Sequence, residues 1–257
     1  MIASMNTPAL KSTEPSAPIA PAPVQTLAVP AEPSPSPLAT GAQGATAAEA
    51  IACALAAPER TAEEAAAHPL ILVVHASVGS GHRSAANAIA EALEEAGEAA
   101  RAAGDDNSLE ARSEVRVLDI LDFGRIVFDG DKTASMFTGW TRPFYDLTWR
   151  YTLTGRLLWG GGTIWARLMY PKFTEYVRRL RPAAIVATHI TAANVAVSAR
   201  MITGQSFPIV CVPTDYEAEG LWPHLHTDLF CVANESMAET LRPRRVPEDR
   251  ILITGIP

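Results

Sequence analysis

The sequence predicts an α/β fold built around a doubly wound parallel β-sheet. One observation is a short apolar run, Leu70–Ala76, which is followed at once by a glycine-containing loop and then by an amphipathic helical pattern. Another is that the chain holds five or six such short runs, separated mainly by helical patterns. Two segments fall outside this alternation, an N-terminal tail and a long aromatic insertion.

The N-terminal tail, residues 1–68, is predicted to be disordered. It contains 10 of the 20 prolines, long Ala/Pro/Ser tracts and no aromatic residue, so it cannot bury enough surface to offset the entropy of ordering. A weak helix over Ala47–Ala57 is the one exception. The tail has neither a basic n-region nor an uninterrupted apolar stretch, which argues against a signal peptide.

Composition limits the possible partners and the compartment. The hydrophobic fraction of 48% is enough for a core, and the net charge of -7 argues against nucleic acid as a partner. Three widely spaced cysteines, Cys53, Cys211 and Cys231, indicate neither a disulfide framework nor a metal site. No stretch approaches the roughly 18 apolar residues of a membrane span. We therefore expect a cytoplasmic protein or a peripheral membrane protein on the cytoplasmic side.

The loop after the first strand contains Ser77, Gly79, Ser80 and Gly81. Small residues let the backbone turn sharply, and they let a ligand approach closely. Free N–H groups at the start of the next helix suit an anion such as a diphosphate. The loop lacks the third glycine of a dinucleotide fingerprint and the Lys-Ser or Lys-Thr pair of a Walker loop. It therefore predicts no bound cofactor.

A histidine, His82, directly follows Gly81. The positive end of a helix dipole disfavours a protonated imidazole, so a histidine at this place suits a general base. The alternative is a polar residue on a solvated helix end. The spacing alone leaves both open.

The helix after the loop is predicted from Ser84 to a stop at Gly97. Its apolar face has three- and four-residue spacing and comprises Ala85, Ala88, Ile89, Ala92, Leu93 and Ala96. A second strand is predicted over Glu114–Ile120, beside the first strand. Asp119 and Asp122 lie near its carboxyl end, where open α/β sheets bind ligands, although carboxylates there also cap helices.

Residues 124–170 are predicted to be an aromatic helical insertion, far longer than an ordinary connection. It holds four of the five tryptophans, and residues 124–182 carry ten Lys/Arg against four acids, a local balance of +6. Tryptophan prefers the lipid headgroup level and arginine pairs with anionic lipid, so a membrane contact is expected. The candidate contact residues are Trp140, Arg142, Trp149, Arg150, Trp159 and Trp165. The alternative is a helical subdomain that packs its aromatic face on the sheet.

The rest of the chain continues the alternation of a Rossmann-like sheet. In order we predict a helix over Lys172–Leu180, a strand over Ala183–Ala187, a helix over Ala192–Met201, strands over Phe207–Val212 and Asp228–Ala233, a helix over Glu235–Leu241 and a strand over Arg250–Thr254. His75, His189 and Asp215 then lie with the glycine loop at the carboxyl edge of the sheet. For each of them alone, a structural hydrogen bond is the alternative.

Five segments occur in the order SVGSGHRSAANAIAEAL, THITAANVA, VPTDYEAEGLWPH, DLFCVANE and ITGIP, with the aromatic insertion after the first. Together they resemble the N-terminal domain of monogalactosyldiacylglycerol synthases and of the related bacterial diacylglycerol glucosyltransferases. The resemblance covers about residues 70–257. It implies that 69–257 is the acceptor-binding N-terminal half of a GT-B fold. Ser80 departs from the three consecutive glycines of plant members.

The resemblance implies a hexosyltransferase that moves a sugar from UDP-galactose or UDP-glucose to diacylglycerol at a membrane surface. In this reading His82 is the base, the glycine loop shapes the acceptor side, and the insertion captures diacylglycerol at an anionic bilayer. Asp215 matches the Thr-Asp pair of the family and is expected to orient the acceptor or His82. His189 and Trp222 are further candidates for the cleft.

Such proteins cross into a second, donor-binding domain at the position of ITGIP, so we expect the donor domain to be absent from this chain. Truncated in this way, the chain is expected to have little or no transfer activity alone, and UDP-sugar is expected to bind only when a C-terminal domain is supplied. Two alternatives remain open. One is a non-catalytic peripheral lipid-binding protein, and the other is a related glycosyltransferase that acts on another lipid carrier.

Overall fold

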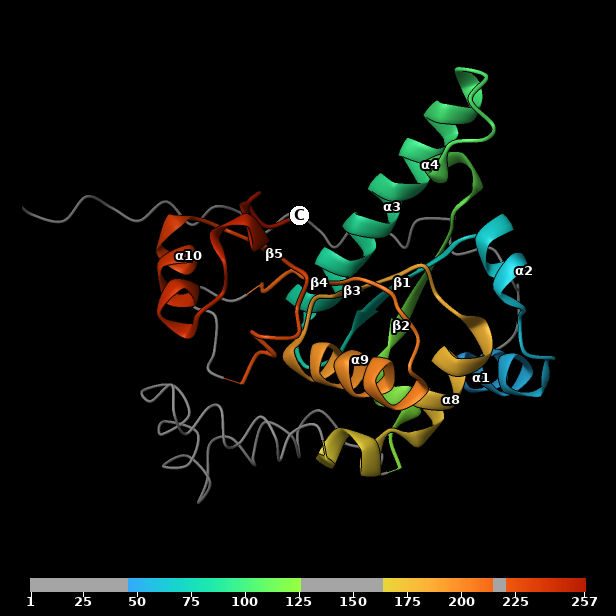
Figure 1. The fold of residues 1–257 in the computed structure, drawn as a ribbon, viewed down its shortest axis with the longest axis horizontal. Coiled ribbons are helices and arrows are strands. Elements are labelled where there is room, and N and C mark those ends of the chain that lie inside the picture. The colour runs from blue at the N-terminus through green and yellow to red at the C-terminus, as the bar shows by residue number, and fades with distance from the viewer. Residues whose placement is uncertain (1–45, 126–163, 215–220) are drawn as a thin grey trace, which may run out of the picture. The chain divides into compact units, whose positions relative to one another are not determined.

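The computed structural model describes residues 46–125, 164–214 and 221–257, which belong to one compact unit, Gly44–Pro257 (Figure 1). Its elements are, in chain order, α1 (Ala47–Ala56), α2 (Ala62–Ala67), β1 (Leu70–His75), α3 (Ser80–Ala102), α4 (Leu109–Arg112), β2 (Glu114–Asp119), the 3₁₀-helix η1 (Ile120–Phe123), α8 (Pro171–Leu180), β3 (Ala184–Ala187), α9 (Ile190–Thr203), β4 (Ile209–Cys211), β5 (Leu229–Val232), α10 (Glu235–Leu241), the 3₁₀-helices η2 (Arg242–Arg244) and η3 (Glu248–Arg250), and β6 (Ile251–Ile253). Residues 164–169 are also helical. Within these ranges, no helix is long and apolar enough to cross a bilayer.

The six strands form one parallel sheet in the order β2-β1-β3-β4-β5-β6. The chain passes from β1 to β2 on one side and then returns to place β3 on the other side of β1. Strand order therefore reverses between β1 and β3, and the ends of these strands flank the crevice where α/β sheets bind ligands. The predicted α/β, Rossmann-like fold is confirmed.

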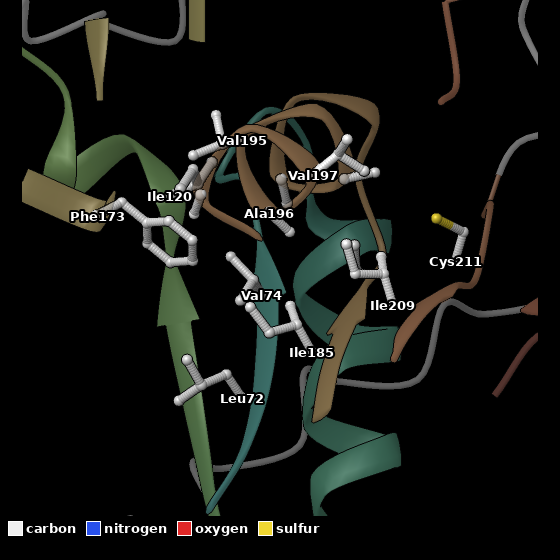
Figure 2. Close-up of a cluster of buried hydrophobic side chains, with 14 of the residues drawn as sticks. Leu72, Val74, Ile120, Phe173, Ile185, Val195, Ala196, Val197, Ile209 and Cys211 are labelled. Carbon is white, nitrogen blue, oxygen red and sulfur yellow. The ribbon is translucent and has the colours of Figure 1, made fainter. Parts of the chain in front are cut away.

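Helices cover both faces of the sheet, with α3 on one side and α8 and α9 on the other (Figure 1). Side chains alternate between the two faces, as a strand dictates. On β1, Leu72 and Val74 belong to the larger core against α8 and α9, whereas Val73 belongs to the smaller core against α3. Figure 2 shows Val74 and Ile185 directed toward α9. Burial on both faces explains why these strands are nearly continuous apolar runs.

Helix α3 is longer at both ends than the sequence predicted. It begins at Ser80, directly after the glycine loop, so His82 lies in its first turn. Gly97 does not end the helix. Gly97 is buried, and a Cβ added to it would lie 2.8 Å from the backbone oxygen of Glu110, a residue of α4. A glycine that follows an amphipathic helical pattern can end the helix or can let another helix pack closely against it. The sequence does not distinguish these two roles, which explains the incorrect prediction.

The buried face of α3 is also rotated from the predicted one. Ala85, Ala86 and Ala90 are buried, whereas Ala92 and Ala96 are exposed. An alanine-rich helix has few large side chains to distinguish its faces, so periodicity defines its orientation poorly. The part of α3 that covers the sheet is its N-terminal half, which carries the buried alanines.

The tail predicted to be disordered contains two helices: α1 lies where a weak helix was predicted over Ala47–Ala57, and α2 was not predicted. The ordered domain therefore begins before residue 69. Both α1 and α2 start with a capping box, formed by Thr46 with Glu49 and by Thr61 with Glu64. Ile51 of α1 is buried in the larger core. Alanine has high helix propensity, and the capping boxes add to it, so a short segment without aromatic residues can fold where it docks on α8.

The other predicted elements lie within two residues of their predicted bounds, whereas α4, η1, η2 and η3 were not predicted. Helix α10 has the predicted bounds, and β3 to β6 are each slightly shorter. Helix α9 starts at Ile190 rather than Ala192, because His189 caps it with its own side chain. This cap places His189 at the carboxyl end of β3.

The described part of the insertion is its base. The Arg125 N–H donates to the Met169 carbonyl at 2.9 Å, which brings its two ends together. In the helical residues 164–169, Ala166 is buried, but Ile164 and Leu168 are 63% and 58% exposed.

We predict that Gly97→Ala destabilises the protein by about 1–2 kcal/mol, because the added methyl clashes with the Glu110 carbonyl while helix propensity improves. Unfolding by urea measures this free energy. Glu98→Ala, at an exposed position of the same helix, is the control and should be neutral or slightly stabilising. An unchanged midpoint for Gly97→Ala would show that α4 moves away at no cost.

Candidate active site

The glycine loop lies at the reversal of strand order, between β1 and α3. The Ser77 N–H donates to Asp119 Oδ1 at 3.4 Å, which links the loop to the end of β2. Gly79 has φ of 91°, a conformation that favours glycine. A Cβ at Gly81 would meet no atom of the described residues within 4 Å, so the loop is open there. No side chain caps α3, and its first N–H groups are available to an anion.

His82 is held by residues that follow two other strands. Its Nδ1 lies 3.0 Å from the carbonyl oxygen of Thr188, after β3, and 2.6 Å from the hydroxyl of Thr214, after β4. In return, the Thr188 hydroxyl donates to the His82 carbonyl at 2.9 Å. The start of α3 and the end of β3 are therefore joined by reciprocal hydrogen bonds.

Two oxygens contact Nδ1 of His82: the Thr188 carbonyl can only accept, whereas the Thr214 hydroxyl can donate or accept. We assign the hydrogen to Nδ1, because this tautomer satisfies the carbonyl and the hydroxyl together. In the neutral ring, Nε2 then carries the lone pair and can accept a proton. A histidine oriented by a backbone carbonyl on one nitrogen, with the other nitrogen free, is the usual arrangement of a general base.

His189 adopts the opposite tautomer. Its Nδ1 accepts from the Thr191 N–H at 3.1 Å, so in the neutral ring the hydrogen is on Nε2. Burial, and then the neighbouring His82 and His75, lower the pKa of His189 to about 3. The rings of His82 and His189 meet edge to face, with centroids 4.6 Å apart. The predicted cluster of histidines at the carboxyl edge thus includes one proton acceptor and one neutral donor.

A second polar group lies where β1 and β2 end. His75 is buried, and its Nδ1 has no hydrogen-bond partner in the described parts of the chain. Burial lowers the pKa of His75, while Asp119 opposes this shift. Burial also raises the pKa of Tyr170 to about 12, with Asp119 adding to it. Asp119 Oδ1 accepts from the Leu121 N–H at 2.9 Å, so the helix-capping alternative for this carboxylate is confirmed.

Trp222, a predicted cleft residue, is part of the core. Its side chain is 1% exposed and meets Phe230 edge to face at 6.3 Å. Its Nε1 has no partner among the described residues. Of the predicted cleft residues, His189 contacts His82. Trp222 instead packs against Phe230 in the core.

Several predicted site residues lie outside the described residues, namely Asp215, Trp140, Arg142, Trp149, Arg150 and Trp159. Trp165 is described: it is 42% exposed and contacts Tyr170 edge to face at 5.5 Å. In the described ranges, no three His, Cys, Asp or Glu side chains are placed to hold a metal ion.

Thr188 and Thr214 are the site residues that sequence reasoning missed. Both lie directly after predicted strands, at the same edge as the glycine loop, and each carries a hydroxyl. This position was a usable signal, since side chains at the carboxyl ends of neighbouring parallel strands converge.

A known protein family matches most of the chain. The family model described as monogalactosyldiacylglycerol (MGDG) synthase matches residues 82–257, more than half of the chain. The chain belongs to this family.

No curated protein matches the chain significantly. Among solved structures, the lipopolysaccharide outer core galactosyltransferase WaaB, in its apo form, is similar, with 12% identity and a TM-score of 0.39. The similarity covers 72% of this chain and 45% of WaaB, so the chain spans less than half of that protein.

We predict that stability falls on acidification, because burial lowers the pKa values of His189 and His224 to about 3. Their folded pKa values lie below the unfolded one, so the unfolded state binds protons first. This stabilisation is present above about pH 6.5 and is lost as pH falls toward 3. Urea unfolding free energies between about pH 7 and pH 5 measure the slope.

The variant His189→Asn should make this slope shallower by about 1 kcal/mol per pH unit, because one such histidine is removed while the Asn oxygen can still cap α9. His68→Asn, at the exposed residue that directly follows α2, is the matched control. Equal slopes for His189→Asn and the unmodified protein would contradict the shifted pKa.

Proposed function

We propose that the chain is the acceptor-binding, base-carrying half of a hexosyltransferase that moves a sugar from a UDP-sugar, UDP-galactose or UDP-glucose, to diacylglycerol at a membrane surface. Membership of the MGDG synthase family supports a glycolipid glycosyltransferase. The observation that carries the proposal is His82 in the first turn of α3, whose Nδ1 contacts the Thr188 carbonyl and whose Nε2 has no hydrogen-bond partner among the described residues.

The geometry supports an inverting transfer by single displacement. The acceptor hydroxyl oxygen attacks the anomeric carbon, the bond from that carbon to the diphosphate oxygen breaks, and the hydroxyl proton moves to His82 Nε2. The resulting imidazolium keeps its Nδ1–H directed at the Thr188 carbonyl and the Thr214 hydroxyl oxygen. The uncapped start of α3 offers N–H donors to negative charge that develops nearby.

Membrane attachment is supported by the base of the insertion. Ile164, Trp165 and Leu168 expose apolar surface there, and Arg167 lies among them. Apolar side chains enter the lipid boundary, and arginine attracts anionic headgroups. Diacylglycerol is found in that boundary, so this contact would bring the acceptor to the same domain that carries the base.

We predict that His82→Ala lowers glycolipid turnover by about 100-fold or more in the complete protein that carries this chain. The product is measured as labelled hexose transferred from UDP-galactose or UDP-glucose to diacylglycerol. His68→Ala, at an exposed histidine that directly follows α2, is the control and should keep normal turnover. Near-normal turnover of a folded His82→Ala variant would remove His82 from the mechanism. Lipid binding without transfer of either sugar would favour the non-catalytic alternative.

We predict that the chain floats with liposomes that contain diacylglycerol and anionic lipid, most strongly at low salt. The double variant Ile164→Ser/Leu168→Ser should bind about tenfold more weakly, because two exposed apolar side chains no longer enter the bilayer. Met201→Ser/Ile202→Ser is the matched control, since these side chains on α9 are 57% and 42% exposed. Equal losses for both double variants would mean that the insertion base is not the lipid contact.

A further inference from the structure

We infer that His82 and His189 act as an acceptor and donor pair that selects an acceptor substrate with two neighbouring oxygens. One oxygen is the hydroxyl that gives its proton to His82, and the other accepts a hydrogen bond from the Nε2–H of His189. The inference rests on the proposed function and specifies its substrate class. It assigns His189 a role in specificity.

The first argument is that different groups contact the two Nδ1 atoms. A backbone N–H, that of Thr191, donates to Nδ1 of His189 and requires a lone pair there. Nδ1 of His82 contacts the Thr188 carbonyl, which can only accept, and the Thr214 hydroxyl, which can donate or accept. A hydrogen on Nδ1 of His82 satisfies both oxygens, and with this assignment Nε2 has a lone pair on His82 and a hydrogen on His189.

The second argument is proximity. The rings of His82 and His189 meet edge to face with centroids 4.6 Å apart, so a ligand that contacts one ring lies close to the other. Neither Nε2 has a hydrogen-bond partner in the described part of the chain.

The third argument is charge. The low pKa of His189 keeps that ring neutral when His82 takes up the proton of the hydroxyl. A protonated His189 would repel the imidazolium that forms at 4.6 Å. A neutral N–H donor holds the second oxygen without this repulsion. The donor matches an ester, ether or hydroxyl oxygen on the carbon next to the reacting one, as in a glycerolipid, and finds no partner in a simple long-chain alcohol.

Two variants separate this role from helix capping. His189→Asn keeps an oxygen that can accept from the Thr191 N–H but loses the donor at the Nε2 position. His189→Gln reaches the Nε2 position with an amide N–H but loses the short capping acceptor. A purely structural His189 would tolerate Asn better than Gln, whereas a residue that selects the acceptor would show the reverse.

The experiment uses the 257-residue chain and two probes, a short-chain 1,2-diacylglycerol and its 2-deoxy analogue, a monoacyl 1,3-propanediol. Dissociation constants come from calorimetric titration. We expect the unmodified chain to bind diacylglycerol about five- to tenfold more tightly than the analogue, the value of one neutral hydrogen bond. His189→Asn should abolish this preference, and His189→Gln should retain most of it. Urea unfolding of each variant verifies the fold.

Equal affinities for the two probes, or a preference that survives in folded His189→Asn, would overturn the inference and leave the proposed function standing. Absence of binding to either probe would instead overturn the proposed function, and the inference with it. Imidazole ¹⁵N spectra of the ligand-free chain separately test the tautomers assigned to His82 and His189. They should show His82 protonated on Nδ1 and His189 on Nε2, and identical tautomers would also overturn the inference.

Discussion

The reciprocal hydrogen bonds between Thr188 and His82 are the interaction on which the rest of the site depends. Thr188 is fully buried, and it both receives from the ring and donates to the backbone of the same residue. This pair of bonds joins the start of α3 to the end of β3 across the point where strand order reverses. Orientation of the ring, its tautomer and the position of the glycine loop all follow from it.

The sheet makes this arrangement rigid. Parallel strands buried on both faces bring their carboxyl ends to one edge, and the two cores hold β1 and β3 from opposite sides. Two hydrogen-bonding groups, one after β3 and one after β4, can therefore meet at one imidazole.

The sequence was sufficient to predict the sheet, because β1 and its neighbours are apolar runs that only a doubly covered strand explains. It also located His82, since a helix start after a glycine loop is a local signal. The roles of Thr188 and Thr214 were missed, because they arise from contacts more than a hundred residues apart in sequence. Gly97 was misinterpreted because its neighbour Glu110 is on another helix. The weak helix predicted over Ala47–Ala57 corresponds to α1, whereas α2 was missed, because the Ala/Pro-rich composition of the tail predicts disorder there.

The two ring nitrogens of His189 have different roles. Nδ1 caps α9, and Nε2 is the donor that we assign to the acceptor substrate. Such sharing limits how the protein can diverge. A substitution that alters acceptor preference through this residue also weakens the start of α9, by about 1 kcal/mol for a lost cap. Evolutionary changes in acceptor preference are therefore expected first at residues that neighbour His189. His189 itself is expected to change later, or together with a substitution that restores the N-cap of α9.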